Sequence, residues 1–180
     1  MKIFVAILCA FLGFMTGAVA AEPPKVHPET ITHDGIAFSL KIGEKDPVVA
    51  YDVVDAWRGK ITIADCTKWS AFANGATWCF ASARNQVKFV TKTDKEGGNA
   101  YAPHLGGRCV LGTSWGYPAA RGDPRTAKVY RTELGDVLIL QSAAKWVPVF
   151  DQDPQVNRKI ARAVFNFGLA SGIITPNRKR

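Results

Sequence analysis

Residues 69–80 read WSAFANGATWCF, and this stretch decides how the middle of the chain folds. Asn74 and Gly75 form the strongest short-range signal of a two-residue β-hairpin turn, because both tolerate the positive φ that such a turn requires. In that hairpin Ser70 faces Cys79 across an antiparallel pair of strands. The sequence therefore predicts two short strands flanking the turn.

The hairpin bears directly on how the cysteines can pair. Cys66 precedes Ser70 by four residues, which places it roughly 13 Å from the paired position at the usual strand rise. A disulfide needs Cα atoms within about 7 Å of each other. A Cys66–Cys79 bridge therefore requires the strand to break or bulge near residues 67–68. The sequence leaves this possible disulfide open, and a bridge that uses Cys109 is a less favoured alternative.

The first twenty residues predict a signal peptide. Lys2 precedes an almost wholly apolar run over residues 3–14, and Ala18-Val19-Ala20 matches the cleavage pattern of a secretory signal. The apolar run is too short for a membrane-spanning helix, although an uncleaved anchor is the alternative. We expect cleavage after residue 20, removal of Cys9, no stable membrane insertion afterwards, and a periplasmic or secreted protein.

The remaining chain of about 160 residues is long enough for one domain with its own core. The full sequence has 23 Lys and Arg against 15 Asp and Glu, a net charge of +8, which falls to about +7 when Lys2 is lost. Such a charge favours anionic partners in general. The basic residues are scattered except at 177–180, which we interpret as a solvated tail. No nucleic-acid partner is expected.

The rest of the sequence predicts an α+β fold, a small single domain with short antiparallel strands and short helices. Residues 21–43 are interpreted as an extended lead-in, in which His27 and His33 are expected to face solvent. Within it, apolar and polar residues alternate over residues 36–42, a pattern that is consistent with a strand. The domain is expected over residues 44–167, followed by a basic C-terminal tail over 168–180. Ser82 can cap a short helix, and residues 128–131 and 137–141 indicate two strands joined through Gly135-Asp136.

The last predicted element is a C-terminal amphipathic helix. Asp153 can cap it and Pro154 suits its first turn. An apolar stripe recurs along it at helical spacing, and we expect this stripe to face the core. The helix should end near Gly168. The stripe consists of Val156, Ile160, Val164 and Phe167.

Residues 101–109, YAPHLGGRC, carry the candidate chemistry. His104 lies five residues before Cys109, with two glycines between them that allow a tight bend. Imidazole and thiolate are ligands that copper and zinc accept, so both residues are candidate metal ligands. Cys109 would begin a short helix, where the helix dipole and Arg108 favour the thiolate. The alternatives are a buried packing cysteine and a solvent-facing histidine.

Enzymatic motifs are missing from the sequence. There is no phosphate-binding glycine loop and no Gly-x-Ser-x-Gly. Three functions stay open: metal binding through Cys109, a non-catalytic structural or interaction module, and, least favoured, a thiol-dependent enzyme that uses Cys109 with His104.

Several of these segments resemble the YHS domain, specifically small exported proteins that carry one. The resemblance covers roughly residues 44–165 and rests on Asp46-Pro47-Val48-Val49-Ala50-Tyr51, on residues 74–82 and above all on the Gly-Gly-x-Cys run at 106–109. It implies the same fold and a metal-binding or metal-handling role through the Gly-Gly-x-Cys loop. Cys66 and Cys79 are not features of that family, and their joint presence favours a bridge particular to this lineage.

Overall fold

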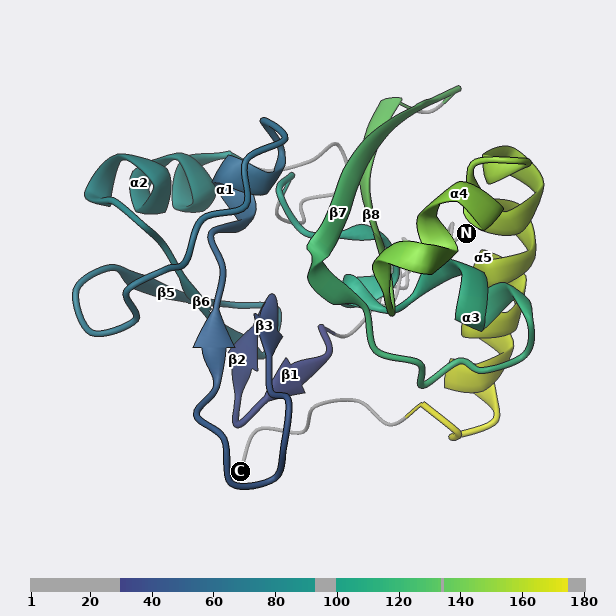
Figure 1. Cartoon of the computed structure of the whole chain (residues 1–180), viewed down its shortest axis with the longest axis horizontal. Coiled ribbons are helices and arrows are strands. Elements are labelled where there is room, and N and C mark those ends of the chain that lie inside the picture. The colour runs from purple at the N-terminus through teal and green to yellow at the C-terminus, as the bar shows by residue number, and fades with distance from the viewer. Residues whose placement is uncertain (1–29, 93–99, 134, 175–180) are drawn as a thin grey trace, which may run out of the picture.

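Strand β8 (Gly135–Gln141) connects two hydrophobic cores because side chains on both of its faces are buried. Leu138 and Leu140 belong to one core and Ile139 to the other, as the two-residue period of a strand requires. The computed structural model describes residues 30–92, 100–133 and 135–174. They form a single small α+β domain with a C-terminal helix, as predicted (Figure 1).

The first core lies among short strands and two helices from the N-terminal half. Its largest buried side chains are aromatic, and the ring of Phe89 lies 5.0 Å from that of Trp78 and 5.1 Å from that of Phe80. One sheet has the order β1-β2-β6-β5, with β2 and β6 parallel, and β3 pairs separately with β4. The elements are β1 (Thr32–His33), β2 (Ile36–Ala37), β3 (Ser39–Leu40), β4 (Val49–Ala50), α1 (Val53–Ala56), β5 (Ser70–Ala73), β6 (Ala76–Cys79) and α2 (Ala83–Thr91).

The second core lies between β8 and the helices of the C-terminal half. β7 and β8 pair as an antiparallel ribbon, and α3 packs against α5 beside it (Figure 1). Gly135 and Asp136 lie inside β8, so the turn precedes the predicted position. The elements are η1 (His104–Gly107), α3 (Val110–Ser114), β7 (Asp123–Thr132), η2 (Ala144–Trp146), α4 (Val147–Phe150) and α5 (Pro154–Ala170).

The predicted hairpin is confirmed in register, and it carries a disulfide. Ser70 pairs with Cys79, and the positive φ angles of Asn74 (52°) and Gly75 (73°) form the turn. β5 begins only at Ser70, because the preceding chain turns: the Asp65 carbonyl accepts hydrogen bonds from the amides of Lys68 and Trp69. This turn brings Cys66 to a Cα–Cα distance of 4.7 Å from Cys79, and the two form a disulfide.

The domain begins earlier than predicted. Residues 30–43 were expected in an extended lead-in, but they contribute β1, β2 and β3. Ala37 and Phe38 are buried in the first core, and β2 pairs with β6. The strand prediction for residues 36–42 is confirmed in part. Burial of these apolar side chains makes the segment a component of the domain.

Helix α5 has its predicted cap but not its predicted buried face. Asp153 accepts a hydrogen bond from the Val156 amide at 3.1 Å, and Pro154 occupies the first turn. The expected apolar stripe is wrong, since Val156, Ile160 and Phe167 are 48%, 44% and 67% exposed. The helix instead buries another face, and it packs beside α3. The buried residues are Arg158, Ala161, Phe165 and Gly168, and the helix ends at Ala170.

Over the described residues, no helix combines the length and apolar character needed to cross a membrane. Ile174 is buried in the second core, so the folded part extends beyond the predicted boundary at residue 167. The predicted signal peptide, His27 and the basic cluster at 177–180 lie outside the described residues.

Candidate functional site

Cys109 lies at the start of α3, where its sulfur acts as the N-cap. The sulfur accepts a hydrogen bond from the Gly112 amide at 3.2 Å, and the thiol donates to Gln141 Oε1 at 3.4 Å. The residue is 1% exposed. The predicted short helix after Gly107 is confirmed and runs to Ser114. The thiol is therefore part of the second core and of its polar connections.

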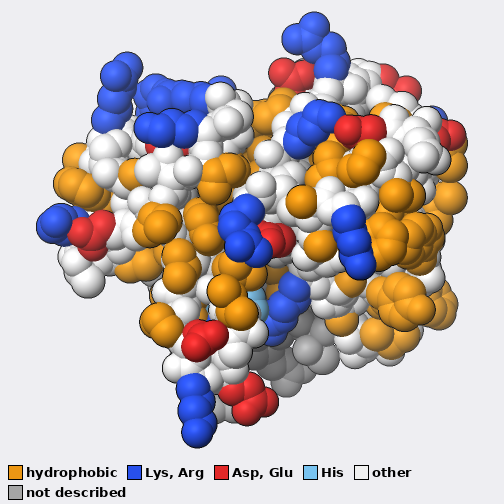
Figure 2. Space-filling view, in the orientation of Figure 1, with side chains coloured by type: hydrophobic (Ala, Val, Ile, Leu, Met, Phe, Trp, Pro, Cys, Tyr) orange, Lys and Arg blue, Asp and Glu red, His pale blue; other side chains and the backbone are white. Residues whose placement is uncertain are grey.

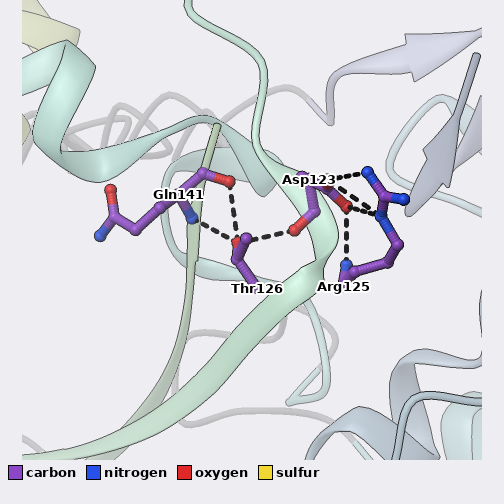
Figure 3. A network of polar contacts seen from close by, with 4 residues as sticks. All are labelled: Asp123, Arg125, Thr126 and Gln141. Atoms are coloured by element: carbon purple, nitrogen blue, oxygen red, sulfur yellow. Dashed lines mark hydrogen bonds and ion pairs between the residues drawn. The ribbon is translucent and has the colours of Figure 1, made fainter. Parts of the chain in front are cut away.

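A polar network holds the backbone of Gln141 at the irregular end of the ribbon (Figure 3). The Thr126 hydroxyl accepts from the Gln141 amide at 2.8 Å and lies 2.8 Å from the Gln141 carbonyl. The same hydroxyl lies 2.7 Å from the Asp123 carbonyl. Arg125 binds the Asp123 carboxylate through Nε and Nη2, at distances down to 2.6 Å. These contacts bridge the register shift between residues 123 and 128.

The side chain of Gln141 points away from this network and towards α3 (Figure 3). Its Oε1 accepts from the Leu111 amide at 3.1 Å in addition to the Cys109 thiol. Since backbone amides only donate, this contact defines which end of the side-chain amide is oxygen. Gln141 Nε2 is buried without a hydrogen-bond partner among the described residues. The site thus joins β8 to α3 through one amide oxygen.

The glycines of the Gly-Gly-x-Cys run have a conformational role, and the bend that they allow packs against Gly122. Leu105, Gly106 and Gly107 all have positive φ (54°, 63° and 86°), so the chain makes a tight left-handed bend. The Gly122 amide donates to the Gly107 carbonyl at 3.1 Å. A Cβ at position 122 would lie 2.6 Å from that carbonyl oxygen, which only glycine avoids.

His104 lies at the start of η1, and the expectation that it faces solvent is wrong. Its Nε2 is buried without a hydrogen-bond partner among the described residues. Burial, with smaller contributions from the guanidinium groups of Arg158 and Arg162, lowers the pKa of His104 to about 4. The imidazole is therefore neutral at neutral pH. The nearby arginines also disfavour a cation bound to it.

The side chain of Arg108 extends towards α5. Its guanidinium lies 5.0 Å from the ring centroid of Phe165, and Nη1 donates to the Leu105 carbonyl at 3.1 Å. A cation over an aromatic face is a favourable packing contact. Arg108 thus joins the loop of residues 105–108 to α5, a role that the sequence did not indicate.

The described residues do not complete a metal centre around Cys109. Among them, no group of three or more His, Cys, Asp or Glu side chains lies close enough together to hold a metal ion. Cys66 and Cys79 are joined to each other. Two ligands from one loop do not close a tetrahedral zinc site. Metal binding by Cys109 and His104 therefore stays an untested prediction, and the described residues provide no third ligand for it.

A second candidate site, missed in the sequence, is an open groove of about 420 Å³ beside β1. Arg121 Nη1 donates to the Thr32 carbonyl at 2.7 Å and lies 2.9 Å from His33 Nδ1. Because arginine only donates, His33 Nδ1 accepts and Nε2 carries the proton. Burial, followed by the Arg121 charge, lowers the pKa of His33. His33 is half-buried, so its assignment to a solvated loop is corrected.

The groove carries charges of both signs. Arg121, His33 and Lys41 line it together with Asp34 and Glu44, and Lys41 pairs with Asp34 at 3.2 Å. No sequence motif signals this site, because its residues come from positions 89 apart that meet only in the fold.

Comparison of the chain with protein-family models, curated proteins and solved structures finds no match. The resemblance to the YHS domain therefore stays a prediction based on the motifs quoted above.

Proposed function

We propose that this protein is an exported, non-enzymatic binding module in which Cys109 is a packing residue. The observation that carries the proposal is the state of Cys109, a residue that is 1% exposed and whose sulfur is engaged by both Gly112 and Gln141. Reactive cysteines are partly exposed, and this position is not. The two glycines of the bend are explained by their positive φ angles.

The disulfide and the groove support the same function. A Cys66–Cys79 bridge suits an oxidising compartment, in agreement with the predicted export. The groove offers a place for a small polar ligand, and the Arg121–His33 contact preorganises part of its wall. Binding at this groove requires no reactive side chain.

Metal handling through Cys109 and His104, with copper or zinc, is the second candidate. It is favoured by the Gly112 amide, which donates to the sulfur and would stabilise a thiolate. Metal binding would require the thiol to leave Gln141. It would also place a cation near the arginines that surround His104. These two costs make it the weaker proposal.

Anaerobic titration with Zn(II), and with Cu(I) kept reduced by ascorbate, separates the two functions. The Cys66–Cys79 disulfide must stay intact, because its reduction would release two further thiols. We expect wild type and Cys109→Ser to take up metal equally. One equivalent bound by wild type and lost in Cys109→Ser, with weaker binding in His104→Gln, would overturn the binding-module proposal. Alkylation of native Cys109 as fast as a free thiol would do the same.

A further inference from the structure

Four basic side chains gather on one face of the protein although they are spread over 35 residues of sequence. Arg84, Lys88 and Lys92 follow one another at i, i+4 and i+8 along α2 and its C-cap, and Arg58 follows α1. The charges of Arg58, Arg84 and Lys92 all act on Lys88. Figure 2 shows Lys and Arg side chains clustered over α1 and α2. We call these four residues the basic face.

The fold holds the basic face rigidly. Asn85 Nδ2 donates to the carboxylates of Asp52 and Asp55, at 2.8 and 2.9 Å, which joins α2 to α1. Phe89 is fully buried in the first core. These inward contacts leave Arg84 and Lys92 exposed and Lys88 half-buried at the surface.

The arrangement is unfavourable for the isolated protein. Like charges at i, i+4 destabilise a helix. Desolvation, followed by repulsion from Arg58 and Arg84, lowers the pKa of Lys88. Asp55 is 8% exposed and is already shared by Asn85 and Arg58, so it offsets the charge only in part. An anionic partner would relieve this repulsion.

Exposed apolar side chains near the cations indicate which kind of anionic partner would fit the basic face. Val87 and Val90, both 56% exposed, lie on the outer side of α2 with Arg84. Cations beside exposed apolar side chains suit a bilayer interface, because lipid headgroups can bind the cations while the apolar side chains insert at the boundary of the acyl chains.

We propose that the basic face docks the protein on membranes rich in anionic phospholipid. This inference rests on the proposed function, since it names a partner for the binding module. It requires no membrane-spanning segment, because the contact is peripheral. Each cation near a charged bilayer should strengthen binding about fivefold.

Co-sedimentation with vesicles of phosphatidylglycerol and phosphatidylcholine tests the proposal, with pure phosphatidylcholine vesicles as reference. We expect wild type to prefer the anionic vesicles, with binding that weakens as salt is raised from 0.1 to 1 M. The double variant Arg84→Gln, Lys88→Gln should bind about 25-fold more weakly. Val87→Ser should weaken vesicle binding several-fold without changing the net charge.

The matched control is the double variant Lys145→Gln, Lys159→Gln, which removes the same charge from exposed positions on η2 and α5. We expect its binding to change less than twofold. All variants begin at Ala21, as expected for the exported chain, so any contribution of residues 21–29 is common to them. Unchanged thermal unfolding of each variant ensures that the comparison is between folded proteins.

Three results would overturn the proposal: equal binding of wild type to both kinds of vesicle, equal weakening by the two double variants, or binding to soluble polyphosphate with none to vesicles. The last result would identify a soluble polyanion as the partner. None of these results depends on the metal titration, so failure of the lipid proposal is distinguishable from failure of the binding-module function.

Discussion

The thiol of Cys109 donates to Gln141 Oε1 at 3.4 Å, so one buried hydrogen bond joins the start of α3 to the end of β8. Since the same sulfur accepts from the Gly112 amide, Cys109 has the donor and acceptor roles of a serine N-cap. Cys109, the candidate ligand in the sequence, thus also connects α3 to β8.

Replacement of Cys109 by alanine should destabilise the protein more than replacement by serine. Serine can retain the cap and the bond to Gln141, whereas alanine removes both and leaves the Gly112 amide unpaired. We expect Cys109→Ala to lower the free energy of unfolding by about 1–2 kcal/mol more than Cys109→Ser. Urea unfolding measures this difference. Equal stability of the two variants would contradict the capping role.

Two phenylalanines on α5 test which face of the helix is buried. Phe165 is 2% exposed and lies against Arg108, whereas Phe167 is 67% exposed. Phe165→Ala should lower the free energy of unfolding by about 3–5 kcal/mol, because it opens a cavity in the second core. Phe167→Ala should change it by less than about 0.5 kcal/mol. If chemical denaturation shows a larger loss of stability for Phe167→Ala than for Phe165→Ala, the buried face is the one expected from the sequence.

Acid should weaken the fold through His104. Its pKa is about 4 in the folded protein and about 6.5 when unfolded, so between these values the unfolded chain binds the extra proton. Its contribution to stability is fully present above about pH 6.5 and is lost as pH falls towards 4, by roughly 3 kcal/mol in total. In His104→Gln the decline of unfolding free energy from pH 7 to pH 4.5 should be shallower. An identical decline in both proteins would show that His104 titrates normally.

Thiol counting tests the disulfide and the burial of Cys109 together. The chain that starts at Ala21 has three cysteines, two of them joined. Without reductant, we expect almost no reaction with a thiol reagent in the native state and one thiol in denaturant. Peptide mapping should assign it to Cys109, and intact mass should confirm the start of the chain. Two or more thiols in denaturant, or a free Cys66, would refute the pairing.

Much local structure was predictable because its causes are local. Asn74 and Gly75 dictate the hairpin through their backbone preferences, and Ser82 and Asp153 cap helices with their own side chains. The hairpin register also showed that a Cys66–Cys79 disulfide requires the strand to break before Ser70. It did not show that the break occurs, because the turn there depends on hydrogen bonds to the Asp65 carbonyl.

Tertiary structure alone decided which surfaces and side chains meet. The apolar stripe of α5 had the correct period, but the buried face is the one with Ala161, Phe165 and Gly168. At Gly168 the absence of a side chain lets Ile174 and Pro118 approach. His104 and Cys109 are close in sequence, yet the left-handed bend between them buries His104 near arginines while Cys109 caps a helix. The amino-acid sequence thus determined turns, caps and periods. Packing over long sequence separations determined burial, charge clustering and the chemistry available to each side chain.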